Sequence, residues 1–375
     1  MYELFIKIRN LIISTLYKYL LKPIFFLMDP EDIHDQMTKI GAFLGKYSLF
    51  RLITKTFFYY KNPILNQNIF EKGYENPIGL SAGFDKNAEL INILPAVGFG
   101  FIEVGSITGE YCDGNPKPRL WRMPKSKSLI VYYGLKNKGA ERISHTIKSS
   151  ISRIPLGINI AMTNCYKNLE IDNAINDYVK AFNIMKIYGD YITINISCPN
   201  ALGGQPFIKP ENLEKLLVNI DKIDNDKKIF IKLSPDINEE ETNTILDILD
   251  KHRIHGIICS NLTKNRNNPK INDEEKNITE KGGISGKAVE DLSNKLLANI
   301  YKKTNNKYLL IGVGGVSSGK DAYEKIINGA SLVQMITGMI FEGPQVISQI
   351  NQELAQILKE KGFKNIKEAI GSGIK

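Results

Sequence analysis

A thiol stands beside two carboxamides in one short segment of the sequence. Cys198 lies in Asn195-Ile196-Ser197-Cys198-Pro199-Asn200, which ends an apolar run and leads into Gly203-Gly204-Gln205. A cysteine with hydrogen-bonding neighbours in a glycine-rich loop can act as a base or a nucleophile. The four cysteines form no CxxC pair, so neither a zinc cluster nor a dithiol motif is indicated. Cys112, Cys165 and Cys259 are expected to be small buried hydrophobes.

Two lysines follow other apolar runs. Lys86 lies in Ala82-Gly83-Phe84-Asp85-Lys86-Asn87, and Lys232 lies near the end of the run 229–234. One such lysine alone could form a Schiff base, because desolvation lowers the pKa of an amine. Two together favour charge stabilisation of a flat cofactor edge or a substrate carboxylate.

Three glycine clusters complete the set of candidate residues: Gly282-Gly283-Ile284-Ser285-Gly286, Gly312-Val313-Gly314-Gly315 and Thr337-Gly338. One cluster alone predicts only a tight turn. Three on one edge of a fold predict a phosphate site, because glycine lets backbone N–H groups approach an anion closely.

The elements that must position these residues are eight short apolar runs that alternate with amphipathic stretches. Each run has the composition of a parallel strand covered on both faces. The runs are 78–82, 101–106, 156–160, 191–197, 229–234, 256–261, 308–314 and 331–337. Eight such units predict an α/β fold, a TIM (β/α)8 barrel, whose chemistry sits at the carboxyl ends of the strands. All the candidates above fall there.

Between the runs, helices are expected over 172–188, 238–251 and 285–302, and an inserted hairpin over 109–131. His252 and His255 have the spacing of a metal pair, but they precede a strand and so belong to the opposite end of the barrel. No metal site is predicted.

The first residues differ from the rest of the chain. Apolar residues at three- and four-residue steps within 1–22 are interrupted by lysine and arginine, which indicates a basic amphipathic helix. The longest uncharged run is far shorter than the ~20 residues of a spanning helix. Such a helix could lie in a membrane interface or pack on its own domain. Pro23 is expected to break it, and Asp29-Pro30 to begin a second helix. We therefore expect a small helical appendage at 1–60 and a barrel at 61–375.

Composition excludes several classes of protein. The 375 residues are 43% hydrophobic, which excludes disorder, and 4 cysteines are too few for a disulfide scaffold. The formal net charge is +9, but lysine is spread along the chain rather than concentrated on one element. This distribution argues against a nucleic-acid partner. The small number of cysteines and the absence of a CxxC pair favour a reduced, cytosol-facing protein.

With these residues placed, the chain resembles the dihydroorotate dehydrogenases, the flavin (FMN) enzymes of pyrimidine synthesis, from about Lys22 onward. The segments that carry the resemblance fall in the expected order: LMDPEDIH, NPIGLSAGFDKN, GFGFIEVGSIT, GNPKPRL, ITINISCPN, IKLSPD, GGISGKAVEDLS, IGVGGVSSGKDAYEKI and GASLVQM. The helical amino terminus resembles the membrane-associated, quinone-using class.

The resemblance implies two half-reactions. A base removes a proton from C5 of dihydroorotate while a hydride passes from C6 to N5 of FMN, and the electrons then pass to a quinone reached through the appendage. Cys198 would be the base. The residues implied to hold FMN are Ala82, Gly83, Lys86, Ser106, Asn159, Asn195, Lys232, Ser260, Gly286, Gly315 and Thr337. Those implied to contact the substrate are Lys86, Asn195, Asn200 and Asn261. The class also implies a peripheral protein on the cytoplasmic face of the inner membrane.

The sequence departs from this family at four places. Cys198 stands where the quinone class usually has serine and the cytosolic classes have cysteine. Val131 replaces a usual substrate-binding asparagine, and Leu262 replaces a usual threonine. Ala161-Met162-Thr163 replaces a usual Gly-Lys-Asn. A buried polar group left unpaired costs roughly 1–3 kcal/mol.

These departures leave alternatives open. Val131 and Leu262 allow a flavin barrel that acts on another dihydropyrimidine or enone. Cys198 allows a cytosolic-type enzyme that uses fumarate or NAD as acceptor. From other classes, a non-redox lyase or isomerase for a sugar phosphate and a membrane-bound scaffold are disfavoured, because neither needs two lysines and a thiol together.

Overall fold

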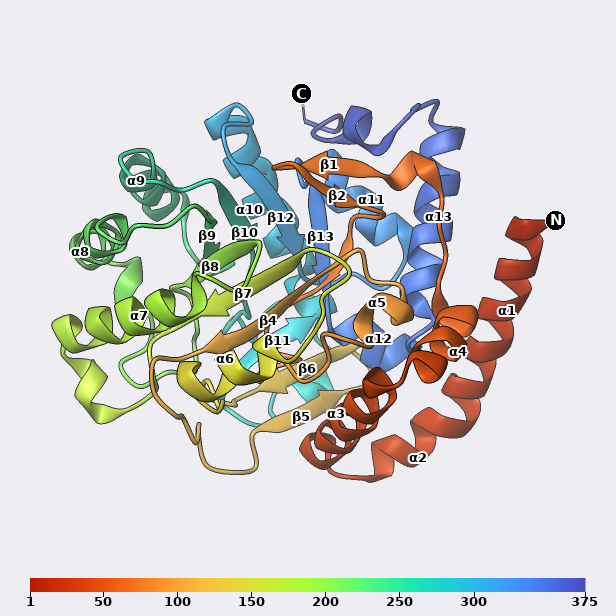
Figure 1. Ribbon diagram of the computed structural model, residues 1–375, viewed down its shortest axis with the longest axis horizontal. Helices are drawn as coiled ribbons and strands as arrows, with labels where there is room; N and C mark the ends of the chain where they lie inside the picture. Colours follow the sequence, from red (N-terminus) through yellow and green to blue (C-terminus); the bar gives the residue numbers. More distant parts are fainter. Residues whose placement is uncertain (375) are drawn as a thin grey trace.

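Eight parallel strands close into a barrel in the computed structural model, which describes residues 1–374 (Figure 1). Every position of β3, β7, β8, β10 and β13 is buried, as expected for strands covered on both faces. The predicted TIM barrel is confirmed, and each of the eight apolar runs forms one of its strands. Around the barrel these are β10 (Gly256–Cys259), β12 (Leu309–Val313), β13 (Leu332–Met335), β3 (Ile78–Leu80), β4 (Phe101–Ile107), β7 (Leu156–Ile160), β8 (Tyr191–Asn195) and β9 (Lys228–Leu233).

Helices surround the barrel and cover its outer face (Figure 1). The expected helix at 238–251 is α9, and Asn238 begins it with a capping box completed by Glu241. The full set is α5 (Leu94–Val97), α6 (Ala140–Lys148), α7 (Ile171–Met185), α8 (Pro210–Asp221), α9 (Glu239–Leu249), α10 (Glu290–Thr304), α11 (Gly319–Ile327), α12 (Thr337–Glu342) and α13 (Val346–Glu360).

The helix expected at 285–302 was placed too early. It begins at Glu290, because Gly283–Gly286 form strand β11, which pairs antiparallel with β6 (Ser128–Val131). The expected hairpin is β6 with β5 (Leu120–Met123), so the insertion is a three-stranded sheet rather than a hairpin alone. A strand pairing between residues more than 140 positions apart leaves no local signal in the sequence.

A second hairpin closes the amino-terminal end of the barrel. Ile69 and Tyr74, on β1 (Gln67–Ile69) and β2 (Lys72–Tyr74), pack in one buried cluster with Phe101, Tyr191 and Phe230 of the barrel strands. The carboxyl end of the barrel is therefore the end at which a ligand-binding site can form.

Four helices precede the barrel: α1 (Tyr2–Leu16), α2 (Lys22–Leu27), α3 (Pro30–Lys46) and α4 (Ser48–Phe58). The expectation that Pro23 breaks the first helix is wrong, since a π-helical turn over Tyr17–Leu21 joins α1 to α2. In this turn the Lys22 N–H bonds to the carbonyl of Tyr17, five residues back. Pro23 then lies in the first turn of α2, where a missing N–H is tolerated. The helix expected after Asp29 is confirmed, and the Asp29 side chain caps it.

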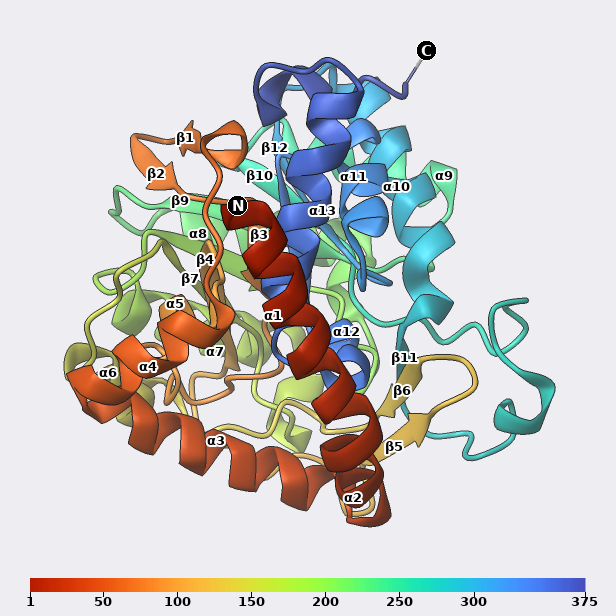
Figure 2. The ribbon, with the colours of Figure 1, turned by 90° about the vertical axis from the view of Figure 1, so that its right-hand side faces the viewer.

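One face of α1 packs on the barrel, beside α13 (Figure 2). Arg9 and Asn10 donate hydrogen bonds to the Ser348 hydroxyl, and the Tyr17 hydroxyl donates to the Ile340 carbonyl at 2.6 Å. The other face stays exposed. Of the 30 exposed large hydrophobic residues described, 21 lie between Met1 and Phe57. Within residues 1–374 no single helix is long and apolar enough to cross a membrane, although the segments 2–27 and 30–46, bent by 120°, pass that test as a pair.

Candidate active site

Two cavities open at the carboxyl ends of the strands and share part of their lining. The central cavity contains the thiol and the amides, and the glycine cavity is lined by the strand ends and turns around β12 and β13. Both are lined by Ala82, Lys232, Asn261, Leu262 and Thr337. The structure brings together every predicted site residue except Asn159. The central cavity is lined by Gly83, Lys86, Ser106, Asn195, Cys198 and Asn200, and the glycine cavity by Ser260, Gly286 and Gly315.

Amide and hydroxyl groups at the ends of several barrel strands form a connected floor beneath the central cavity. Asn195 donates to the Ser106 hydroxyl at 3.0 Å, and Asn261 donates to Asn195 Oδ1 at 3.1 Å. The Ser197 hydroxyl donates to the Lys232 carbonyl at 2.7 Å and so links β8 to β9. Because each of these groups is held by a partner, their positions are fixed before any ligand arrives.

Asn159 lies behind this floor rather than on it. It is fully buried, accepts from the Ser106 hydroxyl at 2.5 Å and donates to Glu103 at 2.9 Å. Glu103 was not identified from the sequence. It lies inside the barrel, where Tyr191, Thr193 and Gln334 also donate to its carboxylate, and it supports Asn159 from below.

Both site lysines lack a carboxylate partner among the described residues. The Lys232 ammonium, on a residue 4% exposed, donates to the Ser81 hydroxyl at 3.2 Å. Lys86 Nζ lies 3.2 Å from His34 Nε2 and 4.0 Å from the centre of the Tyr133 ring. Burial lowers the pKa of Lys232 and lowers that of Lys86 to about 8. Two cations that form no ion pair with a described carboxylate make a site that favours an anionic or electron-rich ligand.

Cys198 faces the same cavity with its pKa raised to about 11, since burial disfavours the thiolate. Backbone N–H groups of Asn200 and Ala201 and the charge of Lys232 act in the opposite direction. Asn200 donates to the Val131 carbonyl at 2.8 Å, and its buried Oδ1 has no partner within residues 1–374. Val131 and Leu262 supply apolar side chains to the cavity.

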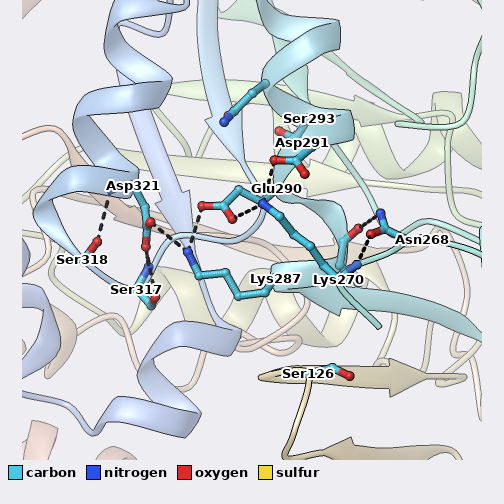
Figure 3. A network of polar contacts seen from close by, with 12 residues as sticks. Ser126, Asn268, Lys270, Lys287, Glu290, Asp291, Ser293, Ser317, Ser318 and Asp321 are labelled. Carbon is cyan, nitrogen blue, oxygen red and sulfur yellow. Dashed lines mark hydrogen bonds and ion pairs between the residues drawn. The ribbon is translucent and has the colours of Figure 1, made fainter. Parts of the chain in front are cut away.

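An ion-pair network stands behind the glycine cavity (Figure 3). Lys287 bridges Glu290 and Asp321 at 2.8 Å each, and Asp321 accepts from the N–H and the hydroxyl of Ser317. Gly315 has φ +76°, and a Cβ there would lie 2.4 Å from Cβ of Glu290, so this position requires glycine. The network fixes the turn that carries the predicted phosphate-binding N–H groups.

Lys325 supports the same strand ends from inside the fold. Its residue is 1% exposed, and its ammonium donates to Ser293 Oγ at 3.0 Å and Asn294 Oδ1 at 2.6 Å. The Ser293 hydroxyl in turn reaches the carbonyls of Cys259 and Val313, which end β10 and β12.

Because burial lowers the pKa of Lys325 to about 7 from 10.5, the stability of the fold should depend on pH. Between these values the unfolded chain binds the proton and the folded chain does not, so the free energy of unfolding rises with pH. We expect Lys325→Met to reduce this rise between pH 7 and 9 by about 1 kcal/mol per pH unit. Urea unfolding of both proteins at pH 7, 8 and 9 measures it, and equal slopes would contradict the assignment.

The appendage reaches the site through residues that the sequence did not single out. Glu31 and His34 of α3 contact Arg119 and Lys86, respectively. Burial opposes ionisation of Glu31, but hydrogen bonds from Arg119 and Lys136 lower its pKa to about 2. The sequence gives no signal for these contacts, because the partners of His34 and Glu31 lie 52 to 105 residues away along the chain.

Comparison with known proteins agrees with this geometry. A family model described as dihydroorotate dehydrogenase matches residues 64–358. The chain is 35% identical to a dihydroorotate dehydrogenase (quinone) of Trichodesmium erythraeum, over 95% of this chain and 98% of that protein. It is 34% identical to the mitochondrial dihydroorotate dehydrogenase (quinone) of Mus musculus, over 94% and 89%.

Solved structures agree with the sequence relatives. The structure of the Eimeria tenella enzyme in complex with ferulenol superposes with a TM-score of 0.81 at 30% identity, covering 92% of this chain and 95% of that one. The barrel, the thiol and amides at its carboxyl end and the family match over most of the length give one conclusion: this chain belongs to the dihydroorotate dehydrogenase family.

Proposed function

We propose that this protein oxidises dihydroorotate to orotate in pyrimidine biosynthesis, with FMN as the resident cofactor and a quinone as the electron acceptor. The observation that carries the proposal is the central cavity, where a thiol faces a fixed amide floor and two lysines that form no ion pair with a described carboxylate. The two sequence relatives named above, from Trichodesmium erythraeum and Mus musculus, are both called dihydroorotate dehydrogenase (quinone), which supports the choice of reaction and acceptor.

The residues present fit FMN. Its phosphate matches the glycine cavity, and its electron-rich ring edge matches the buried, unpaired Lys232. The residues proposed to hold it are Ala82, Gly83, Lys86, Ser106, Asn195, Lys232, Ser260, Gly286, Gly315 and Thr337, with Asn159 acting through Ser106. When bound, FMN supplies the hydride acceptor that no side chain provides.

The substrate is proposed to lie over the amide floor. Lys86 neutralises its carboxylate, and Asn195, Asn200 and Asn261 orient the ring by hydrogen bonds. The unpartnered Asn200 Oδ1 is an acceptor that suits a ring N–H. Cys198 takes the proton from C5, a role that requires the thiolate and the lysine charges near it.

The electron acceptor can be tested by turnover. Purified enzyme with L-dihydroorotate is expected to reduce a short-chain quinone and to reduce neither fumarate nor NAD. Dihydrouracil, which lacks the carboxylate that Lys86 would bind, is the control substrate and should not be oxidised. Turnover with fumarate or NAD but not with quinone would assign the chain to the cytosolic type, and equal turnover of dihydrouracil would contradict the substrate.

The chain is further proposed to consist of an appendage, residues 1–60, and an FMN-binding barrel, residues 61–375, with the appendage docking on a membrane surface. The concentration of exposed apolar side chains on α1–α4 supports docking, and the exposed Lys7 on α1 suits anionic headgroups. The proposed location is the cytoplasmic face of the inner membrane, bound peripherally.

Membrane docking predicts that charge on the exposed face weakens binding to lipid. Leu16 and Leu52 are 53% and 63% exposed, and burying such a side chain contributes about 1.5–3 kcal/mol. The double variant Leu16→Glu/Leu52→Glu should lower co-sedimentation with phosphatidylglycerol-containing vesicles at least tenfold. Ile187→Glu, at an equally exposed position on the barrel, is the matched control and should bind like the native protein. Equal binding by all three proteins would contradict docking through the appendage.

A further inference from the structure

Helix α3 belongs to the appendage, yet two of its side chains contact residues near the carboxyl end of the barrel. Glu31 lies in the first turn of α3, and His34 follows it by three residues. Residues at this spacing lie on one helix face. Glu31 is 2% exposed, and His34 lines the central cavity.

His34 contacts Lys86, the lysine proposed to bind the substrate carboxylate. The separation of Nε2 and Nζ is 3.2 Å, and burial together with the Lys86 charge lowers the pKa of His34 well below its ordinary value. A neutral imidazole nitrogen accepts a hydrogen bond from an ammonium without neutralising it. His34 therefore orients the Lys86 ammonium and leaves its charge available to a ligand.

Glu31 reaches the Cys198–Asn200 loop through Arg119 and Asn115. Its carboxylate accepts from Arg119 Nη2 at 2.7 Å and Nε at 2.9 Å, a two-pronged contact. Arg119 Nη1 donates to the Asn115 carbonyl at 2.8 Å. The Asn115 side chain donates to the backbone carbonyl of Asn200 at 2.9 Å. The chain of contacts ends on the loop that carries Cys198.

We propose that α3 is a positioning element for the dihydroorotate half-reaction: through His34 it holds Lys86, and through Glu31, Arg119 and Asn115 it holds the Cys198–Asn200 loop. The appendage then serves the reduction of the flavin as well as its reoxidation by quinone. This inference rests on the proposed function, and it predicts effects in the complete absence of quinone.

The test uses the full-length holoenzyme under anaerobic conditions without quinone. We expect His34→Leu and Glu31→Gln each to raise the dissociation constant for orotate, read from the flavin spectrum, at least tenfold. We expect each variant to slow single-turnover flavin reduction by L-dihydroorotate at least tenfold. Asp32→Asn, which removes a 59% exposed carboxylate from the same helical turn, and Gln36→Leu are the matched controls. FMN content and thermal unfolding establish that each variant is folded.

A pH titration separates positioning of Lys86 from a general loss of structure. Lys86 faces Asp35, Asp85, Glu31 and Lys136, and its pKa of about 8 sets the pH above which orotate binding weakens. Removing the His34 acceptor disfavours the ammonium, so this pH should fall in His34→Leu. His34→Gln, which restores an acceptor, should return it toward the native value.

For the Glu31 arm, Arg119→Lys gives a second variant that keeps the charge and loses the two-pronged contact. It should weaken orotate binding as Glu31→Gln does. If His34→Leu, Glu31→Gln and Arg119→Lys all bind orotate and reduce flavin within twofold of the native rate, the inference is overturned, even if quinone turnover is lost. Failure of the native flavin to bleach with dihydroorotate would instead contradict the proposed function.

Discussion

Cys198→Ala is expected to slow reduction of the bound flavin by L-dihydroorotate by about 10²–10⁴-fold, the usual contribution of a positioned base. FMN content should not change, because Cys198 is not among the residues proposed to hold the cofactor. Stopped-flow spectroscopy under anaerobic conditions measures the rate, and absorbance of the purified protein measures the FMN content. Cys198→Ser, which introduces the residue usual in the quinone class, should retain more activity than Cys198→Ala.

The pH dependence of the native protein follows from two pKa values with opposite roles. Cys198 must lose a proton, and its pKa is about 11; Lys86 must keep one, and its pKa is about 8. Below pH 8 the second-order rate constant for flavin reduction should rise about tenfold per pH unit, as the thiolate fraction rises. Between pH 8 and 11 the gain in thiolate and the loss of ammonium offset each other, so the rate should level off.

The control for this prediction is Cys165→Ala, which removes a thiol that lies outside both cavities. It should reduce flavin at the native rate with the native pH profile. Near-native flavin reduction by Cys198→Ala would show that Cys198 is not the base.

Lys232→Met is the substitution with the second-largest expected effect. Loss of one charge-assisted hydrogen bond to the cofactor, about 1.5–3 kcal/mol, should weaken FMN binding by about 10- to 150-fold. The FMN-free variant should nevertheless unfold at a higher temperature than the FMN-free native protein, because it no longer buries an unpaired ammonium. Weaker cofactor binding by a more stable apoprotein is a combination that general damage to the fold does not produce.

Fluorescence titration of apoprotein with FMN and thermal unfolding of the apoprotein measure the two effects. Lys228→Met provides the control, since Lys228 begins the same strand at its amino end and lies 5.2 Å from the Phe70 ring, away from the site. An FMN affinity equal to that of the native protein in Lys232→Met would show that this lysine does not hold the cofactor.

The strands and the predicted rim follow from local sequence patterns, and these predictions needed no tertiary information. A continuous apolar run such as 191–197 predicts a strand covered on both faces, and the rule that barrel chemistry sits at carboxyl ends then places Asn195 and Cys198 together. The helix expected from Asn238 likewise depends on local sequence, and the capping hydrogen bonds that the structure shows at its start join residues three positions apart.

Features that depend on distant partners could not be predicted in this way. Strand β11 forms by pairing with β6. Without that partner, the sequence from Ser285 onward predicts the start of a helix instead. The prediction that Pro23 ends the first helix is wrong because a π-helical turn precedes Pro23. No local sequence pattern indicates that turn. The contacts of Glu31 with Arg119 and of Glu103 with Asn159 likewise join residues that only the fold brings together.

At Val131 and Leu262 the sequence shows which side chains differ from the family, and only the fold shows where they lie. Both line the central cavity, so these departures from the family pattern do lie where a substrate would bind. The Val131 position still serves Asn200 through its backbone carbonyl, a contact that does not depend on the side chain. The sequence identified the loss of a side-chain hydrogen bond, and the structure adds the backbone contact that remains.

The most direct test of the proposed function is an anaerobic visible spectrum of the purified protein, recorded before and after addition of L-dihydroorotate and again after addition of a quinone. We expect a flavin band that bleaches with dihydroorotate and returns with the quinone. A flavin band unchanged by dihydroorotate would contradict the proposed substrate and make Val131 and Leu262 the first residues to examine. A protein without a flavin band after reconstitution with FMN would contradict the proposal that this barrel is a flavin-dependent dihydroorotate dehydrogenase.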